Sequence, residues 1–221
     1  HIGILGSRRN IAKAKCEITS SLNPNGLVAI PAGDPILEEE LALVWKGRII
    51  RVALKFNSNH QSESLRNSLT QLPTPNIVGT FLSNDGMLSI NHLKFKLPLE
   101  GRHNAINFML ALAVADELDV SRSELTDLGL DIPPGHQDCY KLGSITLIDE
   151  TYNSSPESVK AALDLLVTKK GRHFAVLGTM LELGEYSVPL HRQIVEYAAH
   201  LDVDGLVVVA SGEEAEVIKS A

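Results

Sequence analysis

The sequence has few cysteines, few aromatic residues and no excess of positive charge. Its 221 residues include 2 cysteines and 1 tryptophan, and 20 lysines and arginines stand against 27 aspartates and glutamates. Because the cysteines form no Cys-x-x-Cys pair, we expect reduced thiols in a cytoplasmic protein. The net charge of −7 and the lack of a basic run argue against a nucleic-acid or membrane-surface partner.

Long apolar runs are also missing from the sequence. None approaches the roughly 20 residues that cross a bilayer, and the first residues lack the basic-then-apolar order of a signal peptide. The 44% hydrophobic content is still enough for one large or two ordinary domains. The chain begins at His1 and ends inside a helical pattern, so we interpret it as a fragment.

Helical and strand-like segments alternate in the first part of the chain. The pattern predicts helices at 7–22 and 36–45 and strands at 27–30 and 48–54, an order typical of a mainly parallel sheet. A polar stretch at 57–75 is predicted to be a loop. Short strands at 77–82, 87–90 and 93–97, separated by turn residues, predict a small antiparallel meander beside the main sheet.

The remainder predicts a domain boundary and a second sheet. Helices are predicted at 105–118 and from Ser121 to near Gly129, before a stiff Pro-Pro-Gly break. We therefore divide the chain into domains at 1–131 and 132–221. Beyond the break, the predicted strands are 145–149, 173–177 and 205–209, and the helices are 156–168, 188–200 and one from about 213. The fold class is α/β, with a doubly wound, Rossmann-like second domain.

A polar loop between a predicted strand and helix is the strongest candidate site. Ser155 is a plausible N-cap, with Pro156 in the first helical turn. Asp149, Tyr152 and Asn153 follow the carboxyl end of the strand, where ligands bind in open α/β sheets. The alternative interpretation is an ordinary capped loop without a ligand.

Three motifs, in this order, resemble the Mur ligases. The first joins His1-Ile2-Gly3 to residues 11–18, the second is Gly101-Arg102-His103-Asn104 with residues 105–107, and the third joins residues 148–158 to 176–184. The resemblance covers nearly the whole chain, from the second half of the family's central ATPase domain into its C-terminal domain. It is greatest to the members that add D-alanyl-D-alanine to UDP-N-acetylmuramoyl-tripeptide.

The resemblance implies an ATP-dependent amide ligase of peptidoglycan synthesis that works as a monomer with Mg²⁺. ATP would phosphorylate the carboxylate of the UDP-linked tripeptide, and the amine of D-alanyl-D-alanine would attack the acyl phosphate. Such a reaction needs cations that neutralise the carboxylate and the γ-phosphate. The catalytic candidates are Lys15 and Arg102. Lys15, as a carbamate, and His1 would hold the metal ion; the alternative for Lys15 is a solvated helix lysine.

The resemblance also implies binding residues. His103 and Asn104 would lie beside the nucleotide at a helix start, although Asn104 could simply cap the helix. Asp149, Tyr152 and Asn153 would contact the nucleotide, and Asn153 also the substrate. Glu182 and His191 would lie near the incoming dipeptide; the alternative is that both are surface groups.

Some features depart from the family pattern. The Gly-rich phosphate loop ending in Gly-Lys-Thr or Gly-Lys-Ser is missing, so we expect the fragment alone to be inactive. Thr179 stands where the family commonly has aspartate, and His136 where arginine often follows Pro-Gly. Two alternatives stay open: a ligase-derived, non-catalytic binding or regulatory module, and another Mur-type or folylpolyglutamate-type ligase.

Overall fold

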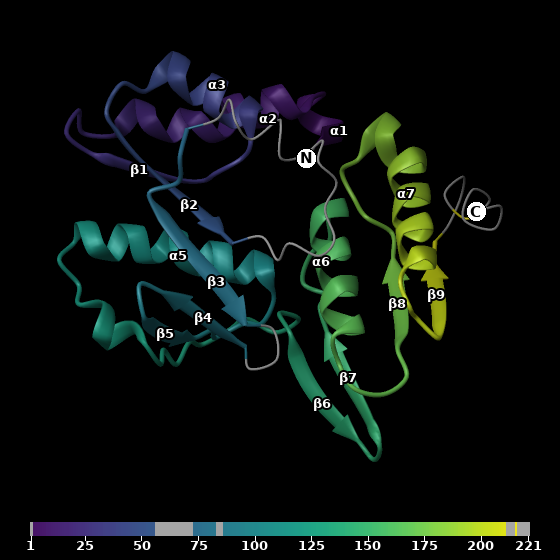
Figure 1. Ribbon diagram of the computed structural model, residues 1–221. Coiled ribbons are helices and arrows are strands. Elements are labelled where there is room, and N and C mark those ends of the chain that lie inside the picture. The colour runs from purple at the N-terminus through teal and green to yellow at the C-terminus, as the bar shows by residue number, and fades with distance from the viewer. Residues whose placement is uncertain (1, 56–72, 83–85, 211–214, 216–221) are drawn as a thin grey trace. The chain divides into compact units, whose positions relative to one another are not determined.

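The computed structural model describes residues 2–55, 73–82, 86–210 and 215 (Figure 1). They form two compact units, one of residues 8–130 and one that combines the residues from 131 onward with those before Arg8. The prediction of an α/β protein is confirmed, and among the described residues three strand pairings are parallel and three are antiparallel. Most of the predicted loop at 57–75 and the helix predicted from residue 213 lie outside the described residues.

The first unit contains a five-stranded sheet in the order β1-β2-β3-β4-β5. Strands β1 (Leu27–Pro31), β2 (Arg48–Leu54) and β3 (Ile77–Leu82) are parallel neighbours. Strands β4 (Met87–Ile90) and β5 (Leu93–Lys96) continue the sheet in antiparallel pairing. The predicted meander is therefore not beside the main sheet but part of it, because β3 pairs with both β2 and β4.

Helices cover both faces of this sheet. Helices α2 (Arg8–Cys16) and α3 (Pro35–Val44) share one core with strands β1 and β2, and α5 (Arg102–Glu117) packs on the other face. Successive strand residues point to opposite faces, so Ile49 joins the first core and Ile50 the second. A 3₁₀ helix, η1 (Glu17–Ser21), follows α2, where the sequence predicted an uninterrupted helix to Leu22.

The helix predicted from Ser121 to Gly129 was wrong beyond its first turn. The structure has only a short 3₁₀ helix, η2 (Arg122–Leu125). After η2, the chain pairs with the end of β5. The Lys96 N–H donates to the Thr126 carbonyl at 2.9 Å, and Lys96 and Asp127 form an isolated parallel β-bridge. Backbone pairing with the strand replaces the next helical turn.

The second unit begins with a hairpin and continues as alternating helices and strands. Its elements are β6 (Asp138–Leu142), β7 (Ile145–Asp149), α6 (Pro156–Val167), β8 (Phe174–Gly178), α7 (Ser187–His200) and β9 (Gly205–Val209). Helices α6 and α7 pack on one face of the parallel pair β8–β9 around Leu163, Ala175 and Ile194. On the opposite face, Phe174, Val176, Val207 and Val209 are exposed.

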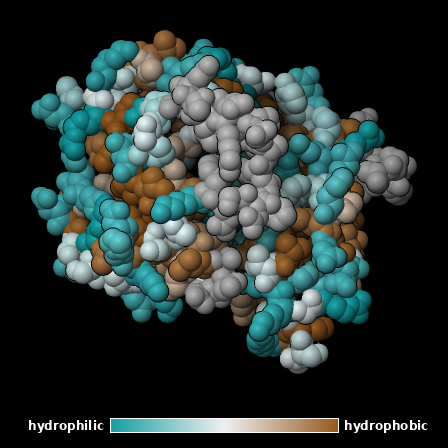
Figure 2. Space-filling view, viewed as in Figure 1, coloured by the Kyte–Doolittle hydropathy of each residue, from teal (hydrophilic) through white to brown (hydrophobic). Residues whose placement is uncertain are grey.

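The β6–β7 hairpin also presents apolar side chains. The register pairs Tyr140 with Leu147 and Leu142 with Ile145, so these four side chains share one face, and all four are exposed. Brown, hydrophobic residues appear at the lower end of the hairpin in the space-filling view (Figure 2). In the described part of the chain, no helix is long and apolar enough to cross a membrane.

The second unit includes a short N-terminal helix, which the predicted division at residue 131 did not assign to it. Helix α1 (Ile2–Leu5) lies against the 3₁₀ helix η3 (Gly184–Tyr186). Gly3 N–H donates to the Glu182 carbonyl at 2.9 Å. A Cβ on Gly3 would lie 2.4 Å from the nitrogen of Gly184, so this backbone approach requires glycine.

The packing of β5 against α5 gives a stability prediction. Phe95 is fully buried, with its ring centroid 5.4 Å from that of Phe108. Phe95→Ala should lower the free energy of unfolding by about 3–5 kcal/mol, because it leaves a cavity in the core. Urea denaturation would measure the loss. Leu93→Ala, on the same strand but exposed, is the control and should cost less than about 1 kcal/mol; equal losses would contradict the assignment of the core.

Candidate functional site

The loop between β7 and α6 is shaped by local hydrogen bonds. The Asp149 carboxylate accepts from Thr151 N–H at 3.0 Å, which turns the chain at the end of the strand. Ser155 Oγ accepts from Ser158 N–H at 3.2 Å, and Ser158 Oγ accepts from Ser155 N–H at 2.8 Å. This reciprocal capping box confirms the prediction that Ser155 begins the helix. Asp149, Tyr152 and Asn153 thus share one fixed loop.

Tyr152 is held by the Pro-Pro-Gly turn. Its N–H donates to the Gly135 carbonyl at 3.2 Å, and its ring meets the ring of His136 edge-on at a centroid distance of 4.1 Å. Gly135 has φ of +82°, and a Cβ there would lie 2.8 Å from Tyr152 N, so the turn requires glycine. The Tyr152 side chain is 65% exposed. A fixed backbone therefore presents this aromatic ring to solvent.

Glu150, two residues before Tyr152 in the chain, has a carboxyl group with a raised pKa. Burial raises the pKa of the Glu150 carboxyl, while hydrogen bonds from Gln137 and the charge of a protonated His136 oppose the rise. Nδ1 of His136 is itself buried and has no hydrogen-bond partner within the described residues. Glu150 was not among the predicted site residues, because nothing in the sequence shows that packing around its carboxyl group would raise the pKa.

The start of helix α5 carries the second group of predicted residues. Gly101, the N-cap, has φ of +109°, and the His103 ring lies close beside it. Burial lowers the pKa of His103, which favours the neutral ring. Asn104 Nδ2 donates to the Glu100 carbonyl at 2.9 Å, while the Arg102 side chain is exposed. An exposed cation therefore adjoins backbone amides that already favour an anion.

Lys15 lies on the exposed side of helix α2. Cys16, next to it, packs into the core with Trp45 of the α3 region. Arg9 anchors the same helix, because its guanidinium donates to Glu39 at 2.6 Å and to the buried carboxylate of Glu40.

Among the described residues, the Lys15 ammonium has no ion-pair or hydrogen-bond partner. His1, the other predicted metal ligand, lies outside the described residues.

The turn after β8 contains Glu182 and contacts His191. Glu182 is exposed and has φ of +60°, uncommon for a residue with a side chain. His191, on α7, is 4% exposed, so the alternative that it is a surface group was wrong.

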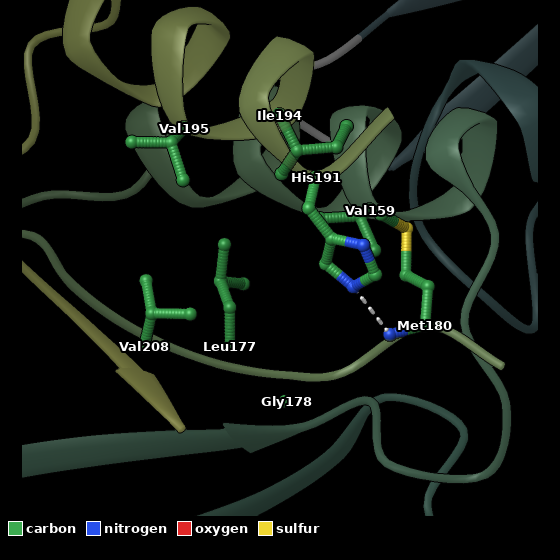
Figure 3. Close-up of a pocket in the computed structure, with 8 residues that line it drawn as sticks. All are labelled: Val159, Leu177, Gly178, Met180, His191, Ile194, Val195 and Val208. Carbon is green, nitrogen blue, oxygen red and sulfur yellow. Dashed lines mark hydrogen bonds between the residues drawn. The ribbon is translucent and has the colours of Figure 1, made fainter. Parts of the chain in front are cut away.

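The ring of His191 makes two hydrogen bonds. Its Nε2 accepts from Met180 N–H at 2.9 Å, the bond dashed in Figure 3, and its Nδ1 lies 2.8 Å from the Ser187 carbonyl. The ring lines a small pocket with Val159, Leu177, Ile194 and Val208.

Comparison with known families gives matches over both units. Residues 1–115, just over half of the chain, match the Mur ligase middle domain, and residues 139–221 match the Mur ligase, glutamate ligase domain. The chain belongs to the Mur ligase family. The predicted boundary at residue 131 falls between the two matches.

Named relatives refine the comparison. The UDP-N-acetylmuramoyl-tripeptide–D-alanyl-D-alanine ligase of Synechocystis is 32% identical over 99% of this chain, and the ligase of the same name from Mycobacterium tuberculosis is 30% identical over 96%. The chain spans 44% and 42% of these two relatives. It is thus similar to slightly less than half of each enzyme.

Solved structures show the same fold. MurF from Acinetobacter baumannii matches with a TM-score of 0.76, and MurF from Thermotoga maritima, in complex with ADP, with 0.74. Each is 24% identical over 99% of this chain, and the matches cover 46% and 48% of those proteins. At this identity the likeness establishes the fold of both Mur ligase domains.

The structure groups the predicted site residues of this Mur ligase into separate clusters. Arg102, His103 and Asn104 share the first turn of α5, and Glu182 is linked to His191 through the backbone of Met180. Sequence reasoning missed Met180 and Gly135, which contribute backbone atoms. A backbone partner leaves no signal in residue type, although the Pro-Pro-Gly sequence marked the turn at Gly135.

The environment of Glu150 gives a pH prediction. Because its pKa is raised on folding, the native state binds more protons than the unfolded state above about pH 4.5, and stability falls as pH rises through that window. Glu150→Gln should therefore stabilise the protein at pH 7 and have little effect at pH 4. Urea midpoints at both pH values would test this.

The control for this comparison is Glu157→Gln. Glu157 is exposed in the first turn of α6, where its charge favours the helix, so the substitution should instead destabilise by about 0.3–1 kcal/mol at pH 7. A Glu150→Gln protein that is less stable than the wild type at pH 7 would contradict the assigned environment.

Proposed function

We propose that this chain carries part of an ATP-dependent amide ligase that adds D-alanyl-D-alanine to UDP-N-acetylmuramoyl-tripeptide during peptidoglycan precursor synthesis. The observation that supports this most directly is the match to ligases of that name over 96–99% of the chain, through both domains. Folylpolyglutamate-type chemistry and a non-catalytic module are the alternatives that an assay must distinguish.

The proposed reaction has two steps. The terminal carboxylate of the tripeptide takes the γ-phosphoryl group of ATP, which releases ADP and leaves an acyl phosphate. The amine of D-alanyl-D-alanine then attacks the acyl carbon through a tetrahedral intermediate, which forms the amide, expels phosphate and releases a proton. Two anions must meet in the first step, so catalysis depends on positive charge placed beforehand. Arg102, exposed beside the start of α5, would supply such charge.

Two clusters would bind the nucleotide. In the first unit, His103 and Asn104 adjoin the helix start, where backbone amides attract phosphate. In the second unit, Asp149 would accept hydrogen bonds from hydroxyl groups, Tyr152 offers an exposed ring for stacking, and Asn153 lies beside them. The fixed backbone around Tyr152 supports this role, because a ring that is held in place loses little freedom on binding.

Mg²⁺ would supply further positive charge at the transferring phosphoryl group. In the described part of the chain, no three His, Cys, Asp or Glu side chains form a cluster suited to a metal ion. A carbamate on Lys15, which is exposed and has no ion-pair or hydrogen-bond partner among the described residues, would supply oxygen ligands for the ion. We propose that His1 is also a ligand of the metal ion.

The proposed activity can be tested with the protein from the complete reading frame. Release of ADP and phosphate should require both UDP-N-acetylmuramoyl-tripeptide and D-alanyl-D-alanine, and mass spectrometry should detect the pentapeptide product. Turnover with L-glutamate or a single amino acid in place of the dipeptide would instead favour another Mur-type or folylpolyglutamate-type ligase. If no acceptor gave ADP release, the chain would be a non-catalytic module.

Lys15 gives the sharpest test of the chemistry. If its carbamate oxygens hold Mg²⁺, Lys15→Ala should lower kcat by at least about a hundredfold, and Lys15→Arg should not restore it. Acetate should partly restore the Ala variant, because it supplies a similar oxygen ligand. Steady-state kinetics in the complete protein would measure each effect. Lys13→Ala, an exposed lysine of the same helix, is the control and should retain activity; an equally active Lys15→Ala would remove Lys15 from the mechanism.

A further inference from the structure

The two hydrogen bonds of the His191 ring determine its tautomer. Met180 N–H can only donate, so the Nε2 that faces it at 2.9 Å must be an unprotonated acceptor. The ring proton is then on Nδ1, where it donates to the Ser187 carbonyl at 2.8 Å. Ser187 Oγ lies 3.3 Å from the same nitrogen. His191 therefore joins the first turn of α7 to the turn after β8 through two directed bonds.

The turn after β8 depends on the hydrogen bond from Met180 N–H to the His191 ring. Met180 is 3% exposed, so its N–H would be a buried donor without a partner if the ring were absent. Leu183 is also buried, and these two side chains anchor the turn in the core of the second unit. Between the anchors, Leu181 is 75% exposed and Glu182 is exposed as well. The turn therefore has fixed ends and a tip that faces solvent.

The tip is held in a strained backbone conformation. Glu182 has φ of +60°, a left-handed conformation that is unfavourable for a residue other than glycine. Its carbonyl accepts from Gly3 N–H at 2.9 Å, which restrains the tip from one side, while His191 restrains the chain at Met180 from the other. Removing one restraint should allow Glu182 to relax to a different conformation.

We infer that His191 is a positioning residue for the incoming dipeptide, acting through the Met180 N–H to set Leu181 and Glu182, an inference that rests on the proposed ligase function. Leu181 offers an apolar side chain and Glu182 a carboxylate, which complement the methyl groups and the ammonium of D-alanyl-D-alanine. His191 itself does not touch the substrate, because its two ring nitrogens bond to the protein and the ring is buried.

Two polar substitutions separate the two bonds of the ring. In His191→Gln, the side-chain carbonyl can reach the position of Nε2 and accept from Met180 N–H. In His191→Asn, the shorter amide can replace only the Nδ1 donor toward Ser187. The control is His200→Asn: His200 also lies on α7 and its Nδ1 is 2.6 Å from the carbonyl of Glu196, four residues earlier, but its side chain is exposed.

Steady-state kinetics of the complete ligase should separate the variants. His191→Asn should raise KM for D-alanyl-D-alanine about tenfold or more and leave KM for ATP and for the tripeptide within about twofold of wild type. His191→Gln should stay within about threefold of wild type for all three substrates, and His200→Asn should match it. Equal losses in His191→Asn and His191→Gln, or an unchanged KM for the dipeptide in His191→Asn, would overturn the inference.

Hydrogen exchange distinguishes failure of this inference from failure of the proposed function. Without substrates, peptides covering residues 179–184 should exchange faster in His191→Asn than in His191→Gln or wild type, while the rest of α7 keeps its protection. If the wild type catalysed no ligation, the proposed function would fall, and faster exchange would still support a positioning role for His191 in the turn. Unchanged exchange in His191→Asn would overturn that role whatever the activity.

Discussion

Backbone polar groups at the ends of strands need partners, and this constraint shapes the candidate loops of the second unit. A strand that ends inside a domain leaves N–H and C=O groups that neither sheet nor helix satisfies. Here Tyr152 N–H finds the Gly135 carbonyl and Met180 N–H finds the His191 ring. Each partner comes from elsewhere in the chain, 17 residues before Tyr152 in one case and 11 after Met180 in the other. The loops are therefore fixed by distant residues.

The first unit meets a different constraint, the change of pairing direction at β3. This strand pairs with β2 in parallel through residues 77–79 and with β4 in antiparallel fashion through residues 80–82. Gly79 lies in the strand where Leu88 and Met109 approach, and a Cβ there would lie 2.9 Å from each of those side chains. The missing side chain allows Met109 of α5 to pack closely on the sheet. The position of the α5 helix, and with it that of Arg102, His103 and Asn104, depends on this approach.

The sequence predicted the regular elements well, because their signals are local. The strand at 48–54 and the helix cap at Ser155 follow from periodicity and from residue types a few positions apart. The helix from Ser121 was mispredicted beyond Leu125, since its pattern was overridden by pairing of Thr126 with Lys96, 30 residues earlier. The same reason explains the candidate site. Asp149 and Tyr152 could be found beside a predicted strand, but the burial of His191 and the raised pKa of Glu150 depend on tertiary packing that no local pattern records.

Thr179 and His136, which depart from the Mur ligase pattern, each make a contact within the second unit. Thr179 stands where Mur ligases commonly have aspartate, and its hydroxyl donates to the Val209 carbonyl at 3.4 Å, joining the ends of β8 and β9. An ionised aspartate could not make that bond, because it has no proton to donate. His136, in place of an arginine, instead packs its ring against Tyr152. In the role that we infer for this turn, the carboxylate that meets the ammonium of the dipeptide is that of Glu182, which is exposed on the same turn as Thr179. The geometry that fixes Glu182 then matters more in this chain than it would beside a second carboxylate.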